Sequence, residues 1–159
     1  MADPRQEARR TAGRLVTLTR AGQLDAVTGS LTLLGFAGQR QEQRLRLILG
    51  ALIEGLAVMV VHRAAAMGMT GTFGADLRGA DAASVDIDGL TPPVRATVRA
   101  LLAAVNGCPQ DAEDQVALAL AGGAKTNVEV IVLALRWTAN ALEWCADTDR
   151  PTWLDLKAG

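Results

Sequence analysis

The sequence predicts an all-α fold: a single-domain helical bundle of five or six main helices around a long central apolar helix. Half of the 159 residues are hydrophobic, and most of these are Ala, Leu and Val, a mixture that favours helices. Apolar residues recur at helical spacing in several stretches. A chain of this length can bury its own core without disulfides or metal, so we expect one domain over residues 1–159.

The first two helices are predicted from their ends. Asp3 followed by Pro4 is a typical N-cap and first-turn pair, and a helix is expected through about residue 20. Apolar residues then follow at helical spacing from Leu24 to Leu34, which predicts a second, shorter helix that ends at Gly35.

The long central helix is predicted from residue 39 to about residue 69, because this stretch has no proline and no turn cluster. Its most apolar part, residues 47–61, contains Glu54 and is shorter than the roughly 20 residues that cross a bilayer, so a core helix is expected. Small residues recur every seven positions along it, at Gly50, Ala57 and Ala64. This repeat predicts a face that a neighbouring helix backbone approaches closely.

The next stretch, residues 70–90, is rich in Gly, Asp, Ser and Ala without any period, and is predicted to be a long flexible loop. Thr91 and the two prolines after it predict the start of another helix, which Gly107 ends. A short helix is expected between Cys108 and Gly122.

The last major helix is predicted to begin at a capping box formed by Thr126 and Glu129. Its polar residues recur at helical spacing, which favours a helix over a strand in this β-branched region. Trp137 and Trp144 lie seven residues apart and are candidates for the core or a subunit interface. A short tail, residues 148–159, is expected to follow.

Composition and charge limit the compartment and the classes of partner that the sequence favours. The chain has two cysteines, Cys108 and Cys145, without metal-ligand spacing, and its N-terminus lacks an apolar signal region. A reducing, cytoplasmic environment is expected, without a membrane partner. Residues 1–63 carry nine Arg against five acids, whereas residues 64–159 carry seven bases against twelve acids. This asymmetry favours an anionic partner near the N-terminal half, or head-to-tail self-association.

No known catalytic or cofactor motif is complete in the sequence. The Gly122–Thr126 stretch lacks the glycine that a P-loop requires directly before its lysine. The segment around Asp86 and Asp88 resembles a calcium loop, but Arg95 would occupy its closing ligand position. We therefore predict no catalytic residue, no cofactor and no metal site, and leave open only weak divalent-cation binding by the acidic loop.

A polar pocket is one candidate site. Glu54 and Arg136 are isolated charges in very apolar helices, and a buried charge needs a partner. We expect these two side chains to pair, or to flank a pocket with His62 and Asn140. His62 is the only histidine, which excludes sites built from several histidines.

A nucleic-acid surface is a second candidate. The polar start of the long helix follows a short helix and a turn, as in a helix-turn-helix, and Arg and Gln are suitable groove readers. The candidate residues are Arg5, Arg9, Arg40, Gln43 and Arg44. Glu42 in the reading face and the long apolar continuation of the helix argue against this interpretation.

Three functions remain open. The high hydrophobicity favours a non-enzymatic helical interaction or regulatory protein, which self-associates as a homo-oligomer or docks a protein partner through apolar helix surface. The first alternative is a small DNA-binding regulator that uses the Arg and Gln residues of the N-terminal half. The second is a small-molecule-binding or enzymatic bundle with a polar pocket around Glu54 and Arg136.

Overall fold

The elements of the chain are helical throughout the part that the computed structural model describes, residues 2–35, 38–74, 76–77, 81 and 83–145. In chain order they are α1 (Pro4–Arg20), α2 (Leu24–Gly35), α3 (Gln39–Ala66), the 3-10 helix η1 (Ile87–Gly89), α4 (Pro92–Val105), α5 (Pro109–Ala119) and α6 (Ala124–Trp144). The predicted all-α bundle is confirmed. The predicted tail, residues 148–159, lies outside the described residues.

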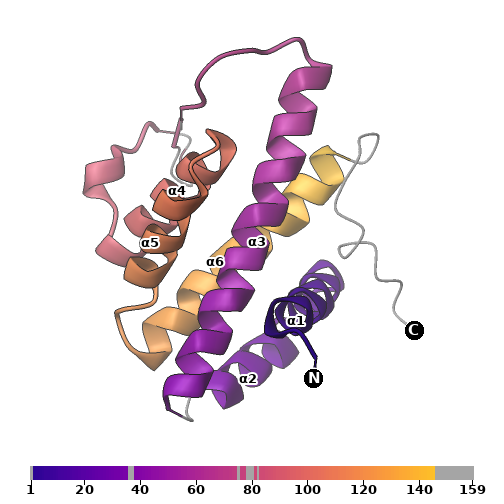
Figure 1. Ribbon diagram of the computed structural model, residues 1–159, viewed down its shortest axis with the longest axis vertical. Coiled ribbons are helices and arrows are strands. Elements are labelled where there is room, and N and C mark those ends of the chain that lie inside the picture. Colours follow the sequence, from indigo (N-terminus) through magenta and orange to yellow (C-terminus); the bar gives the residue numbers. More distant parts are fainter. Residues whose placement is uncertain (1, 36–37, 75, 78–80, 82, 146–159) are drawn as a thin grey trace.

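Helix α3 occupies the centre of the bundle (Figure 1). Helix α6 crosses behind it, α1 and α2 lie on one side, and α4 and α5 form a tightly packed hairpin on the other side. The position of α3 follows from its composition, because an apolar helix of 28 residues must bury most of its circumference. The prediction of a long central helix is therefore confirmed.

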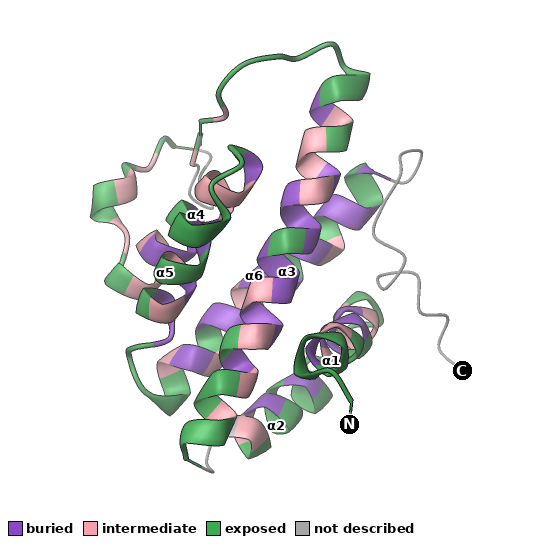
Figure 2. Cartoon of the chain, viewed as in Figure 1, coloured by how far each residue is buried: buried purple, intermediate pink, exposed green. Residues whose placement is uncertain are grey.

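All six helices contribute to one contiguous hydrophobic core. Leu49 and Leu52 of α3 and Ile131 and Leu135 of α6 are completely buried where the two longest helices meet. Figure 2 shows that buried residues follow α3 over most of its length, while the outward faces of α4 and α5 are largely exposed.

Helix α3 also has the length and hydropathy of a membrane span, the one such helix in the described chain. Just over half of its most apolar window, 56%, is buried inside the bundle. The buried core helix of a bundle meets the same criteria of length and hydropathy.

One helix start differs from the prediction, and another agrees with it. The capping box of Thr126 and Glu129 is wrong, because α6 already begins at Ala124 and both residues lie inside the helix. Gly123 adopts a φ of +96°, and this left-handed turn leads the chain directly from α5 into α6. The N-cap of α1 is confirmed, since the Asp3 carboxylate accepts a hydrogen bond of 3.0 Å from the Arg5 amide.

The connection between α3 and α4 is long, and its described residues are mostly without regular structure, as predicted for residues 70–90. One side chain anchors its first part. Asn106, which follows α4, accepts a hydrogen bond from the Phe73 amide at 2.8 Å and donates one to the Phe73 carbonyl at 3.1 Å. It donates a further bond to the Leu102 carbonyl at 2.9 Å.

Replacing Asn106 with alanine is expected to release the backbone at Phe73. Because the bonds are exposed to water, the free energy of unfolding should fall by only about 1 kcal/mol. Hydrogen exchange at the Phe73 amide should accelerate strongly in Asn106→Ala, while the amides of α6 keep their protection. Unchanged exchange at Phe73 would contradict this anchoring role.

Candidate functional site

A groove runs along α3, with the N-terminal part of α1 on one side and α5 on the other. Its volume is about 720 Å³, within the range of about 300–1,000 Å³ that is usual for ligand sites. The α3 residues that line it extend from Gln43 to His62. At 1.5 Å per residue this length is about 28 Å, or five helical turns. We call this feature the α3 groove.

The floor of the α3 groove is mostly apolar, with small side chains and one charge. Its central residues on α3 are Leu47, Gly50, Ala51, Ile53, Ala57 and Val58, and the exposed carboxylate of Glu54 lies among them. A methyl group built at Gly50 would meet no neighbouring side chain or helix within 4 Å, so the space above this residue is open. The predicted close helix neighbour is therefore absent at Gly50, whereas Ala57 and Ala64 are buried.

The two sides of the α3 groove carry opposite charges. Arg5 and Arg9 line it from α1, and Glu113 and Asp114 line it from α5. The Arg9 guanidinium donates to both carboxylate oxygens of Glu54 on α3, at 3.0 and 3.1 Å.

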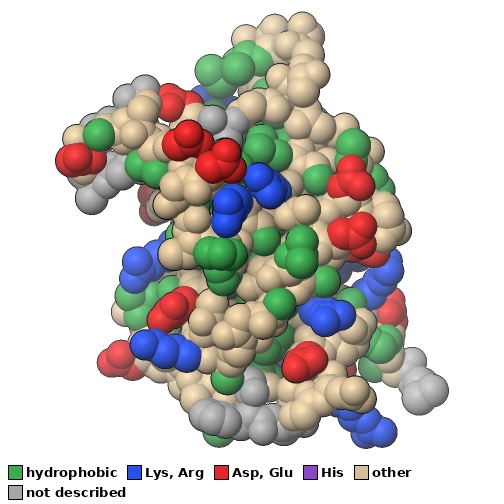
Figure 3. Space-filling view, turned by 90° about the vertical axis from the view of Figure 1, so that its left-hand side faces the viewer, with side chains coloured by type: hydrophobic (Ala, Val, Ile, Leu, Met, Phe, Trp, Pro, Cys, Tyr) green, Lys and Arg blue, Asp and Glu red, His purple; other side chains and the backbone are tan. Residues whose placement is uncertain are grey.

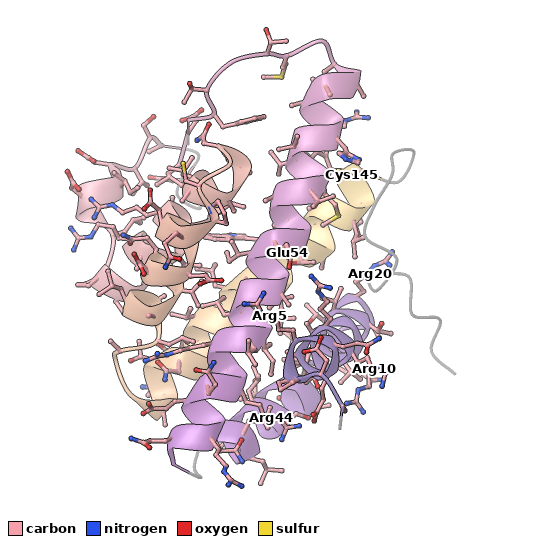
Figure 4. The ribbon with its side chains drawn as sticks, viewed as in Figure 1. Arg5, Arg10, Arg20, Arg44, Glu54 and Cys145 are labelled. Carbon is pink, nitrogen blue, oxygen red and sulfur yellow. The ribbon has the colours of Figure 1, made fainter. Side chains whose placement is uncertain are left out.

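One ion pair connects the two sides of the groove. The Arg5 guanidinium lies 3.8 Å from the Glu113 carboxylate, and both side chains are about two-thirds or more exposed. Figure 4 shows Arg5 reaching from α1 across the front of α3, with Glu54 further along the same helix. The groove is thus crossed by a weakly held, solvent-exposed pair.

The predicted polar pocket is only partly assembled. Glu54 and His62 line the α3 groove, but Arg136 and Asn140 do not, and both of these are exposed on α6. Glu54 pairs with Arg9 in place of Arg136, so the predicted Glu54–Arg136 pair is wrong. The reason is that both charges remain in contact with water, and neither requires a buried partner.

The candidate nucleic-acid residues also separate into two groups. Arg5, Arg9 and Gln43 line the α3 groove. Arg44 lies outside it and forms an ion pair of 2.6 Å with Glu7 of α1. Arg40 is exposed at the start of α3. Intrachain acids thus neutralise three of these four arginines, Arg5, Arg9 and Arg44.

The two candidate interface tryptophans differ in burial. Trp137 is half-buried against the core, while Trp144 is 48% exposed at the end of α6. The Arg63 guanidinium lies 5.6 Å from the Trp144 ring centroid, a cation–π arrangement. On the face that carries α4 and α5, hydrophobic side chains form small groups separated by charged ones (Figure 3).

The acidic loop does not gather its carboxylates. Within the described part of the chain, no three His, Cys, Asp or Glu side chains are arranged to hold a metal ion. Asp86 accepts a hydrogen bond from the Asp88 amide at 3.0 Å, and the Asp88 carboxylate lies 3.4 Å from Arg99. These contacts are local, and they leave the α3 groove as the best-formed candidate site.

Sequence reasoning missed the α5 side of this groove. Glu113 and Asp114 lie in the acidic first half of a short helix, a pattern that a solvated helix face also produces. Their approach to Arg5 depends on how the α4–α5 hairpin packs against α3, and no local signal encodes this. The chain matches no known protein family, no curated protein and no solved structure.

Proposed function

We propose that this chain is a non-enzymatic interaction protein that docks an apolar helix of a protein partner in the α3 groove. The observation that carries the proposal is the shape of the groove: it follows one helix for about 28 Å, a distance that a partner helix of about 19 residues would fill. A small molecule would occupy only a part of this length.

The floor of the groove suits a helix. Helix axes in contact are separated by about 8–10 Å, and the smaller distances require small side chains at the contact. Gly50 faces open space, and Ala51 and Ala57 continue the low floor. Leu47 and Val58, which are only half-buried, add apolar area that a partner would remove from water, at about 25 cal/mol per Å².

The two alternative functions have less support. DNA binding needs arginines that are available to phosphates, and Arg9 and Arg44 form close ion pairs with acids of the same chain. The pocket hypothesis needs Glu54 and Arg136 in one cavity, and Arg136 lies outside the groove. A second copy of this chain as the occupant remains an outcome that the experiment separates.

The test introduces a large side chain on the floor of the α3 groove. In Gly50→Leu the new side chain should project into the space that the partner helix needs, and capture of a partner from host lysate should fall at least about tenfold, equivalent to about 1.4 kcal/mol. The matched control is Gly29→Leu in α2. Gly29 also faces open space in a helix, but it lies outside the groove.

Both substitutions replace a helical glycine with a better helix former, so neither variant should lose stability. A partner that survives nuclease, is retained by Gly29→Leu and is lost by Gly50→Leu agrees with docking in the groove. Equal capture by both variants, or capture that nuclease abolishes, would contradict the proposal. If the captured protein is the chain itself, sedimentation of the two variants should show a dimer that only Gly50→Leu weakens.

A further inference from the structure

The basic side chains of α1 and the acidic side chains of α5 lie on opposite sides of the α3 groove. Arg5 and Arg9 of α1 form a basic wall, and Glu113 and Asp114 of α5 form an acidic wall. Arg46 of α3 adds a further positive charge to the lining. Opposite walls of this kind attract opposite charges on whatever lies between them.

Contacts within the chain satisfy these charges only in part. Arg9 is well paired with Glu54, through two bonds near 3 Å. The pair across the groove, Arg5 with Glu113, is longer at 3.8 Å and exposed to water. Asp114 accepts only a 3.4 Å bond from Gln110 of its own helix, and Arg46 has no ion pair within the described chain. An occupant could therefore replace the Arg5–Glu113 contact at small cost.

We infer that the occupant is an amphipathic helix with acidic side chains along the flank that faces α1 and basic side chains along the flank that faces α5. This inference rests on the proposed function. The apolar stripe of the helix would lie on the floor between Leu47 and Val58, and its two flanks would meet the two walls. The arrangement is that of a coiled coil, in which charges beside the apolar seam select the partner and its orientation.

The charges also set the direction of the bound helix. Turning a helix end for end over the same floor exchanges its flanks, so acid would then face the acidic wall of α5. Like charges across an interface are unfavourable, and one direction is preferred. A partner with two acidic or two basic flanks would meet one repelling wall in either direction.

The experiment uses a displayed library of helices of about 19 residues, with a fixed Ala and Leu stripe and flanks randomised among Glu, Lys and Gln. Selection on the full chain should enrich helices with Glu on one flank and Lys on the other, by about two- to fivefold per flank over Gln. Selection on Glu113→Arg/Asp114→Arg, which makes both walls basic, should enrich Glu on both flanks.

The control is Glu129→Arg/Glu143→Arg. These residues are exposed on α6, outside the groove, and the double substitution changes the net charge by the same amount. It should enrich the same helices as the unmodified chain. Helices enriched without any flank preference, or with the same preference in all three proteins, would overturn this inference but leave docking in the groove intact. Failure to enrich any helix over unselected display would instead overturn the proposed function.

Discussion

Leu52→Ala is expected to lower the free energy of unfolding by about 3 kcal/mol, within the range of about 2–5 kcal/mol for such truncations. Leu52 lies in the middle of α3 and has no exposed surface. Truncation removes its transfer free energy and leaves a cavity where the surrounding helices cannot close fully. For a chain whose total stability is about 5–15 kcal/mol, this is a large loss.

Urea unfolding followed by circular dichroism would measure the change as a shift of the midpoint at constant slope. The control is Leu118→Ala, because Leu118 is 58% exposed on α5 and its truncation should change stability by less than about 0.5 kcal/mol. Similar losses in the two variants would show that the core is not centred on α3.

Gly107→Ala is expected to destabilise the chain by about 1–2 kcal/mol, because Gly107 has a φ of +76° that a residue with a Cβ atom rarely adopts. Gly107 forms the turn between α4 and α5, where the Cys108 amide donates to the Ala103 carbonyl at 2.8 Å. The melting temperature should fall by about 2–8 °C in a chain of this size. Differential scanning calorimetry would measure this shift.

The opposite change is expected for Gly50→Ala. Gly50 lies inside α3, is not among the glycines with positive φ, and has open space where the methyl group would go. This substitution should raise the free energy of unfolding by up to about 1 kcal/mol, which is the difference in helix propensity. If Gly50→Ala and Gly107→Ala were equally destabilising, the left-handed turn after α4 would not explain the effect.

Local signals in the sequence predicted the helices well because helix ends have local causes. Proline at position 4 and glycine at position 107 fix backbone angles that depend little on the rest of the fold. The prediction of a capping box at Thr126 is wrong because the chain already turns into the helix at Gly123, and α6 begins without a side-chain cap. Both positions carry a local signal for a helix start, and the helix begins at the one nearer to α5.

The candidate site was harder to predict from the sequence because its contacts join residues that are far apart along the chain. Glu54 was recognised as an isolated charge, but its partner Arg9 precedes it by 45 residues. From the sequence alone Arg136 is an equally reasonable partner, because the arrangement of the helices has no local signal. The repeat of small residues at Gly50 and Ala57 predicts a face for close approach, but no neighbouring helix of the chain lies close to Gly50. It could not indicate that the space above Gly50 is left open by the chain itself.

The two cysteines differ in exposure to solvent, so one of them can carry a spectroscopic reporter without any substitution. Cys145 is completely buried, whereas Cys108 is exposed and directly precedes Pro109, a residue of the α3 groove. A maleimide dye should therefore react with Cys108 in the folded protein much faster than with Cys145. The emission of a dye attached to Cys108 would then report in real time when an occupant binds in the groove, without any engineered residue.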